Sequence, residues 1–267
     1  MSKLGRKKGL IKGLVMLLLV SVSIPLSVGC STKAGDVKEV NKQEKKEEKI
    51  DSIKVQYIGN SCFYLTLSNG MHIVTDPYQK GFDTDFGPFP KVSAELVTVS
   101  HTHSDHTGWD RVGGKPKVIQ PTELNKPIKV GAVEVTGYPS LHGAGMGDNT
   151  IFVFKIGDFK IVHLGEVGKI ESQETLKAIK DADLILPPVG EVGAMPVEDI
   201  IKLTTEANAR VIIPQHYSMS EDNLFYNQPT VDKYLSVLPK GTEINKLDEF
   251  VLKKDAKKQV VVLSKMK

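Results

Sequence analysis

The sequence lacks the features that mark several large classes of protein. No segment combines a basic patch with interleaved aromatic residues, as a nucleic-acid-binding surface requires, so no nucleic-acid partner is expected. The main apolar stretch, residues 14–26, is shorter than the ~20 residues that a membrane-spanning helix needs. No internal repeat is strong enough to predict a repeat architecture. With 267 residues, of which 40% are hydrophobic, the chain is long enough for one sizeable core and too short for two large domains.

Cysteine is also scarce, at two residues in the chain. Cys30 follows a segment with the pattern of an export signal, in which basic residues precede residues 14–26 and small residues lead into a Gly-Cys ending. That ending resembles a bacterial lipobox more than an Ala-x-Ala cleavage site, although Ser27 stands where the lipobox usually has leucine. We expect residues 1–29 to be a lipoprotein signal peptide and Cys30 to carry a lipid such as palmitate. An uncleaved anchor and plain secretion are the alternatives.

This interpretation predicts a lipid-anchored protein at the extracytoplasmic face of a bacterial cell membrane. Residues 30–50 would then be a tether, because lysine and glutamate dominate them and leave no apolar face to bury. Acidic and basic residues alternate there, so an arm that binds lipid head groups or a partner is the weaker interpretation. Loss of the five basic residues of the signal would change the formal net charge from +3 to −2. The other cysteine, Cys62, would have no disulfide partner, and its strand-like surroundings predict core packing.

Residues 51–267 are predicted to form one domain, with strands in its first half and helices mixed with strands in its second. Short apolar or alternating runs predict strands at residues 53–58, 62–67, 71–75, 95–100, 117–120, 128–130, 133–138, 151–156 and 160–163. Helical spacing predicts helices at residues 172–181, 196–209 and 230–238, with further strands at 184–186, 210–214 and 259–263. Residues 78–90, rich in Gly, Pro, Phe and Asp, form either one wall of a cleft or a structural loop with buried phenylalanines.

A dense group of possible metal ligands directly follows the predicted strand at residues 95–100. His101, His103, Asp105 and His106 form the pattern HxHxDH. Imidazole and carboxylate are ligands of zinc and neighbouring divalent ions, so this density indicates a metal site. In an extended segment His101 and His103 share a face and can reach one ion, whereas Asp105 and His106 follow a turn and could serve a second. A solvated polar turn would not explain why a buried strand leads directly into these side chains.

Further landmarks follow in a fixed order along the chain. Besides HxHxDH, they are Ile58-Gly59-Asn60-Ser61 with Phe63, Thr75-Asp76-Pro77, Ser140-Leu141-His142-Gly143, His163-Leu164-Gly165-Glu166, Leu186-Pro187-Pro188-Val189-Gly190 and Ile213-Pro214-Gln215-His216-Tyr217. With these landmarks, the sequence from about residue 53 to 217 resembles the metallo-β-lactamase fold hydrolases, within the group that includes ascorbate-6-phosphate lactonase and the N-acyl-phosphatidylethanolamine phospholipase D enzymes.

The resemblance implies both a fold and a set of ligands. The fold is an α/β (α+β) protein, a four-layer αβ/βα sandwich in which two sheets pack face to face with helices outside. The implied metal ligands are His101, His103 and His142 for a first ion, and Asp105, His106 and His216 for a second.

Glu166 occupies the position at which this family usually has a bridging aspartate. Its side chain is one methylene longer and would carry the carboxylate past the aspartate position, which puts the second ion in doubt. Glu166 could bridge with a shifted backbone, bind one ion, or have lost its role as a ligand. Asp76 is expected beneath the site, accepting a hydrogen bond from a ligand histidine, or else serves as a turn residue. His163 is expected to support the site or the fold, and His72 to lie outside the site.

Together these features predict a metal-dependent hydrolase with a small-molecule substrate. A bound divalent ion lowers the pKa of coordinated water towards ~7 and polarises the substrate oxygen that it contacts. Metal-bound hydroxide would then attack a small ester, lactone, amide or phosphodiester, with Asp105 as the catalytic residue that orients the water or accepts its proton. Zinc, as one or two ions, is the first expectation, and manganese is possible. The alternatives are a phospholipase D-like phosphodiesterase and a non-catalytic metal- or ligand-binding lipoprotein.

Overall fold

The computed structural model describes residues 49–222 and 224–267. The predicted signal peptide, Cys30 and residues 31–48 of the predicted tether therefore lie outside the described residues. Ile50, at the end of that tether, already packs in the main core. Within the described part of the chain, no helix has the length and apolar character needed to cross a membrane.

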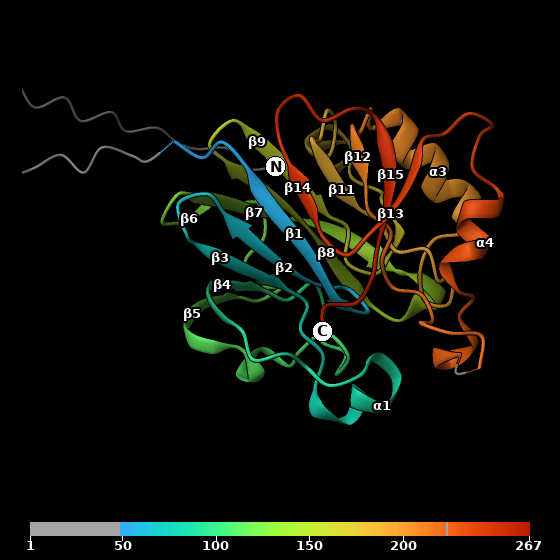
Figure 1. Cartoon of the computed structure of the whole chain (residues 1–267), viewed down its shortest axis with the longest axis horizontal. Coiled ribbons are helices and arrows are strands. Elements are labelled where there is room, and N and C mark those ends of the chain that lie inside the picture. The colour runs from blue at the N-terminus through green and yellow to red at the C-terminus, as the bar shows by residue number, and fades with distance from the viewer. Residues whose placement is uncertain (1–48, 223) are drawn as a thin grey trace, which may run out of the picture. The chain divides into compact units, whose positions relative to one another are not determined.

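The fold is built on two β-sheets (Figure 1). The first sheet has the strand order β14 (Phe250–Leu252), β1 (Ile53–Gly59), β2 (Cys62–Leu67), β3 (His72–Thr75), β4 (Ser93–Thr98) and β5 (Gly113–Ile119). The second has the order β10 (Val167–Lys169), β7 (Val133–His142), β8 (Asp148–Ile156), β9 (Phe159–His163), β11 (Leu184–Leu186), β12 (Val211–Ile212), β15 (Gln259–Leu263) and β13 (Ile244–Leu247), and β6 (Ile128–Val130) pairs with β7.

The two sheets pack against each other through one large core. Phe63 and Leu65 of the first sheet share this core with Phe152 and Phe154 of the second. Because side chains alternate along a strand, Cys62 points to the other face of its sheet. There it belongs to a smaller apolar cluster with Phe86 and Phe225, as expected for a cysteine that packs in a core.

Helices lie outside the sheets, so the expected sandwich is confirmed, although its helices are few. They are α1 (Asp83–Phe86), α2 (Gln173–Ala178), α3 (Val197–Glu206) and α4 (Val231–Ser236). Helix α3 buries Val197, Ile200 and Leu203 at the spacing of one helical face. Figure 1 shows α3 and α4 beside β12, β15 and β13, with α1 at the lower edge of the view.

The predicted strands and helices are all present, with bounds that differ by a few residues. Three short strands, β10, β13 and β14, and the short helix α1 were not predicted. The segment of residues 78–90 holds a 3-10 turn, η1 (Lys80–Phe82), and helix α1, and it buries Phe86. It is therefore a structural segment with a buried phenylalanine, one of the two forms that its composition allowed.

Candidate metal centre

All seven residues predicted as metal ligands lie near the carboxyl ends of strands. HxHxDH follows β4, His142 ends β7, Glu166 follows β9, and His216 follows β12. β7 and β9 run in the same direction because each is antiparallel to β8. β9 pairs in parallel with β11, and β11 pairs in parallel with β12, so all four strands run in the same direction. The ligand candidates of the second sheet consequently meet at one edge, where the loop after β4 brings those of the first sheet.

The structure sorts the seven side chains into two overlapping groups. In each group, one possible ligand atom per residue lies within 4.8 Å of every other. The first group is His101, His103, His142 and Glu166, and the second is Asp105, His106, Glu166 and His216. These two groups contain the ligand sets that the resemblance implied, with Glu166 as the shared member. A third group brings Asp76 together with His101 and His106, one residue from each set.

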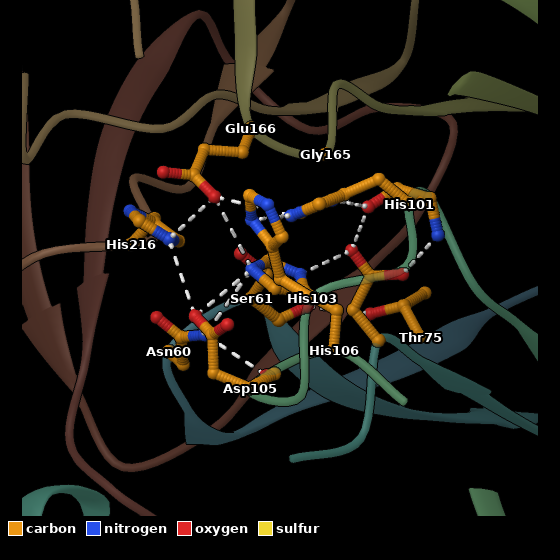
Figure 2. A network of polar contacts seen from close by, with 12 residues as sticks. Asn60, Ser61, Thr75, His101, His103, Asp105, His106, Gly165, Glu166 and His216 are labelled. Atoms are coloured by element: carbon orange, nitrogen blue, oxygen red, sulfur yellow. Dashed lines mark hydrogen bonds and ion pairs between the residues drawn. The ribbon is translucent and has the colours of Figure 1, made fainter. Parts of the chain in front are cut away.

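Glu166 lies between the two groups through a single carboxylate oxygen (Figure 2). Its Oε2 atom is 2.8 Å from the Nε2 atom of His142, 3.3 Å from those of His101 and His216, and 3.5 Å from that of His106. The extra methylene of glutamate has therefore not carried the carboxylate out of the centre. The sequence left open whether the backbone at residue 166 would allow a glutamate to bridge. In the structure, this backbone allows Glu166 to face both groups.

Gly165 accounts for this backbone position. Its φ angle of +58° lies in the left-handed region, and a Cβ atom there would be 2.3 Å from Asn149 Oδ1 and 2.6 Å from Ser100 Cβ. Only glycine avoids both the strain and these contacts. Asn149 Oδ1 also accepts a 2.9 Å hydrogen bond from the Glu166 backbone N–H. The backbone at Gly165 therefore packs closely against Ser100, at the start of the loop that carries HxHxDH.

The imidazole rings are held by their outward-facing Nδ1 atoms. His106 Nδ1 is 2.9 Å from Asp76 Oδ2, His101 Nδ1 is 3.0 Å from Ser100 Oγ, and His142 Nδ1 is 3.0 Å from the Gly143 carbonyl. An Nδ1–H that donates to such a partner leaves the lone pair of Nε2 free to bind an ion. These three rings accordingly present Nε2 to the centre.

Asp76 holds the position beneath the site that the sequence suggested. Besides contacting His106, its carboxylate accepts hydrogen bonds from the Ser100 hydroxyl and, at 2.7 Å, from the Ser100 backbone N–H. Asp76 is fully buried. Its hydrogen bonds tie the end of β3 to the segment that begins HxHxDH.

Two residues near the second group had no role assigned from the sequence. Asn60 donates through Nδ2 to Asp105 Oδ2 at 3.1 Å, and its carbonyl accepts a 2.8 Å hydrogen bond from the His216 backbone N–H. Gln228 lies with its side-chain amide 3.2 Å from His216 Nδ1. A positive φ of 53° in the Gly59-Asn60 turn suits asparagine, but only the fold shows what its side chain contacts.

The electrostatics of the cluster favour ionised carboxylates. Burial raises the pKa of Glu166, but attraction to His216 and the close imidazoles of His101, His106 and His142 outweigh it and lower that pKa well below its usual value. Burial also raises the pKa of Asp105, and its interactions with His106 and His216 reverse the direction and lower it. For His216, burial lowers the pKa, while Glu166 and Asp105 raise it to about 9. Negative charge is therefore retained at a buried site.

The residues present fit divalent metal ions. The ion pairs that Asp76, Asp105 and Glu166 form within the described residues are all with histidines. The Nε2 atoms of His142 and His216 are buried and make no hydrogen bond there, yet both face Glu166. Ligand atoms ~2.0–2.1 Å from one tetrahedral ion are themselves ~3.3 Å apart, and the separations around Glu166 Oε2 are similar.

The two remaining histidines do not join either group. His163 is buried, and its Nε2 atom is 3.0 Å from the Ser61 carbonyl, so it supports the fold beside the site. His72 stacks on Tyr64 and lies 3.8 Å from Glu95. Both positions agree with the expectations from the sequence.

A cleft of about 460 Å³ opens beside the second group. Its lining residues are His103, Ser104, Asp105, Met146, Glu166, Val192, His216, Phe225, Tyr226 and Gln228. Asp105 and Glu166 are thus reached from the cleft although both are buried. Residues 78–90 do not line the cleft, but two of them, Phe82 and Phe86, pack edge to face on the cleft residue Phe225.

Comparisons with known proteins agree with this geometry. Residues 54–216 match the family model of the β-lactamase superfamily domain. A protein of Pelotomaculum thermopropionicum named a UPF0173 metal-dependent hydrolase is 28% identical over 196 residues, which are 62% of this chain and 85% of that protein. A protein of the same name from Enterococcus faecalis is 23% identical over 189 residues, 60% of this chain and 84% of its own length.

A solved structure from Thermotoga maritima is also similar. It is provisionally named a zinc-dependent hydrolase of the metallo-β-lactamase superfamily. It is 29% identical to this chain, covers 80% of it and all of its own length, and superposes with a TM-score of 0.63.

Proposed function

This chain belongs to the β-lactamase superfamily and is a metal-dependent hydrolase, and from that premise we propose which residues bind the metal and what the enzyme hydrolyses. The first ion would be held by His101, His103 and His142. The second would be held by Asp105, His106 and His216, with Glu166 between the two.

One observation carries this proposal: a single oxygen of Glu166 lies within 3.5 Å of four imidazole Nε2 atoms, two from each group. A carboxylate oxygen in that position suits a bridging ligand. We propose zinc as the metal because imidazoles dominate the ligand set, with manganese as the alternative for a set that also contains carboxylates.

The proposed reaction is hydrolysis of a small ester, lactone, amide or phosphodiester. Bound divalent ions supply hydroxide from water near neutral pH and polarise the substrate oxygen that they contact. Asp105 lies at the inner end of the cleft, and the Asn60 amide fixes its carboxylate. Because its pKa is lowered, Asp105 stays ionised and accepts a hydrogen bond from the attacking water. Its main role is therefore to orient that water.

The metal content of the purified protein tests the ligand assignment. Elemental analysis after reconstitution should give about two ions per chain, as a complete two-ion ligand set predicts. His103→Ala and Asp105→Ala should each lower the content by about one ion and abolish hydrolysis, while His72→Ala serves as the matched control outside the site. Full metal content in both site variants would contradict the assignment.

We further propose that the enzyme is exported and anchored through a lipid on Cys30. The support is the sequence pattern of residues 1–30, which lie outside the described residues. Expression in a bacterium with a labelled palmitate analogue should give a labelled protein in the membrane fraction. Cys30→Ser should remove the label and release the protein from membranes. A labelled Cys30→Ser variant would contradict this proposal.

A further inference from the structure

We propose that the cleft selects substrates in which an uncharged acyl group carries a hydrocarbon portion, so that esters, lactones or amides are hydrolysed in preference to phosphodiesters. This inference rests on the proposed hydrolytic function and narrows its substrate class. In the reaction, water adds a hydroxyl to the acyl carbon and a proton to the leaving oxygen or nitrogen as the bond between them breaks.

The outer cleft is formed by large apolar side chains from three separate loops. Met146 lies between β7 and β8, Val192 between β11 and α3, and Phe225 and Tyr226 form part of a 3-10 turn, η4 (Phe225–Asn227). Met146, Val192 and Tyr226 are 46%, 42% and 67% exposed. Single exposed apolar residues are common, but several around one cavity beside a polar site are typical of a surface that binds an apolar ligand.

The apolar wall of the cleft, formed by Met146, Val192, Phe225 and Tyr226, is supported by contacts with residues that do not line the cleft. Phe225 packs on Phe82 and Phe86, with ring centroids 5.8 Å and 4.6 Å away, and its backbone N–H donates to Ser218 Oγ at 2.8 Å. Tyr226 has a φ angle of +47°, which is unfavourable for a bulky residue, and its ring lies 4.4 Å from that of Phe225. Strained backbone of this kind is concentrated at ligand-binding sites. The exposed ring of Tyr226 is therefore positioned at the cleft.

The cleft has no lysine or arginine to pair with an anionic substrate: none of its described lining residues is of either type. Sites for phosphate groups commonly supply arginine or lysine to pair with the oxygens. Lys233 of α4 forms an ion pair with Glu191, next to Val192 in the sequence. Outside the proposed ions, the described cleft thus offers an acyl chain apolar contacts and offers a phosphodiester no lysine or arginine.

A panel of substrates with the same leaving group tests this selectivity. The metal-loaded full-length protein would be assayed with p-nitrophenyl acetate, butyrate and octanoate, and with bis(p-nitrophenyl) phosphate. We expect kcat/KM to rise with acyl length by up to roughly 4-fold for each methylene that becomes buried. The phosphodiester should react at least about tenfold more slowly than the octanoate ester. Because p-nitrophenyl esters are also the more reactive compounds in water, the change of this ratio in cleft variants is the measure of the selectivity of the cleft.

Cleft variants connect the selectivity to the apolar wall. Met146→Ala and Tyr226→Ala should each reduce the ratio of octanoate to acetate kcat/KM by roughly 3-fold or more, with metal content unchanged. Val192→Lys should lower that ratio and raise phosphodiester hydrolysis relative to octanoate. Val251→Ala and Val251→Lys are matched controls, since Val251 is 44% exposed on β14 and does not line the cleft. Equal ratios in cleft and control variants would overturn the proposal.

A binding measurement separates this inference from the proposed function. Calorimetry on the metal-loaded protein would compare acetohydroxamate with octanohydroxamate. If the longer compound binds more tightly, and Tyr226→Ala abolishes the difference, the role of the apolar wall is supported. This holds even if no substrate of the panel is hydrolysed, because the absence of hydrolysis would count only against the proposed reaction. Equal affinities, or faster phosphodiester than ester hydrolysis, would overturn the acyl preference while a hydrolytic function stands.

Discussion

The two halves of the metal centre differ in how their side chains are held. In the second group, Asp76 contacts His106, Asn60 contacts Asp105, and Gln228 contacts His216. Each of these partners is a side chain from a different segment. In the first group, His142 contacts a backbone carbonyl, His101 a serine hydroxyl, and the part-buried His103 contacts His101. The sequence left the second ion in doubt because of Glu166, yet the second group has more side-chain contacts that hold its ligand candidates in place.

The largest effect should come from the residue that both halves share. Glu166→Ala should lower the metal content by more than one ion per chain and reduce kcat/KM by roughly 100-fold or more. This exceeds the 10- to 100-fold loss that is typical when a partner of a metal ligand is removed. Glu166→Asp should also lower both quantities, because a shorter side chain draws the carboxylate away from four Nε2 atoms. Elemental analysis and the ester assay measure this. Higher activity in Glu166→Asp would instead show that glutamate is a misplaced bridge.

A smaller and unequal effect is expected at Asp76. Asp76→Asn replaces the acceptor of His106 Nδ1 and should weaken binding of the second ion by roughly 10- to 100-fold. The first ion should be affected less, because Asp76 reaches His101 only through the Ser100 hydroxyl. Competition with a chelator measures the two affinities. Thermal unfolding in excess chelator separates this effect from a loss of stability, because both proteins are then compared without metal. Equal weakening of both ions would show that the halves are not held independently.

Gln228 offers a sharper test of the second half. Its buried Oε1 has no hydrogen-bond partner within the described residues, whereas Nε2 faces His216 Nδ1. Exchanging the two amide atoms would let Nδ1–H donate to Oε1 and would free His216 Nε2 for an ion. Gln228→Leu should then weaken the second ion by about tenfold, and Gln228→Glu should restore it. A glutamate variant as weak as the leucine variant would argue against this positioning role.

The smallest effect is expected in the first half. Ser100→Ala removes the hydroxyl beside His101 Nδ1 together with its hydrogen bond to Asp76, but leaves the backbone hydrogen bond from residue 100 to Asp76. For the first ion, only the contact with His101 is lost. Loss of one ordinary hydrogen bond corresponds to a change of roughly 2- to 12-fold in the affinity of the first ion. The same chelator competition measures it, with His72→Ala as the control. A change larger than that of Asp76→Asn would reverse the order proposed for the two halves.

The sequence predicted the parts of this molecule that are repeated or clustered. Alternating apolar residues predicted β1, β2 and β9 closely, and HxHxDH identified the centre because its ligands are neighbours in the chain. The roles of Asn60 and Gln228 were missed because each contacts ligands from distant segments. The carboxylate position of Glu166 was also unpredictable, since it depends on how closely Gly165 packs against Ser100 and Asn149.

The ligand candidates come from both sheets, and this affects how the protein folds. HxHxDH follows a strand of the first sheet, whereas His142, Glu166 and His216 follow strands of the second. Neither sheet alone can assemble either group, so a complete ligand set exists only once the sheets have docked. An ion held from both sides would then be a reversible cross-link, whose binding free energy would add to the stability of the docked state. Chelation of the metal should therefore weaken the association of the two sheets as well as the reaction.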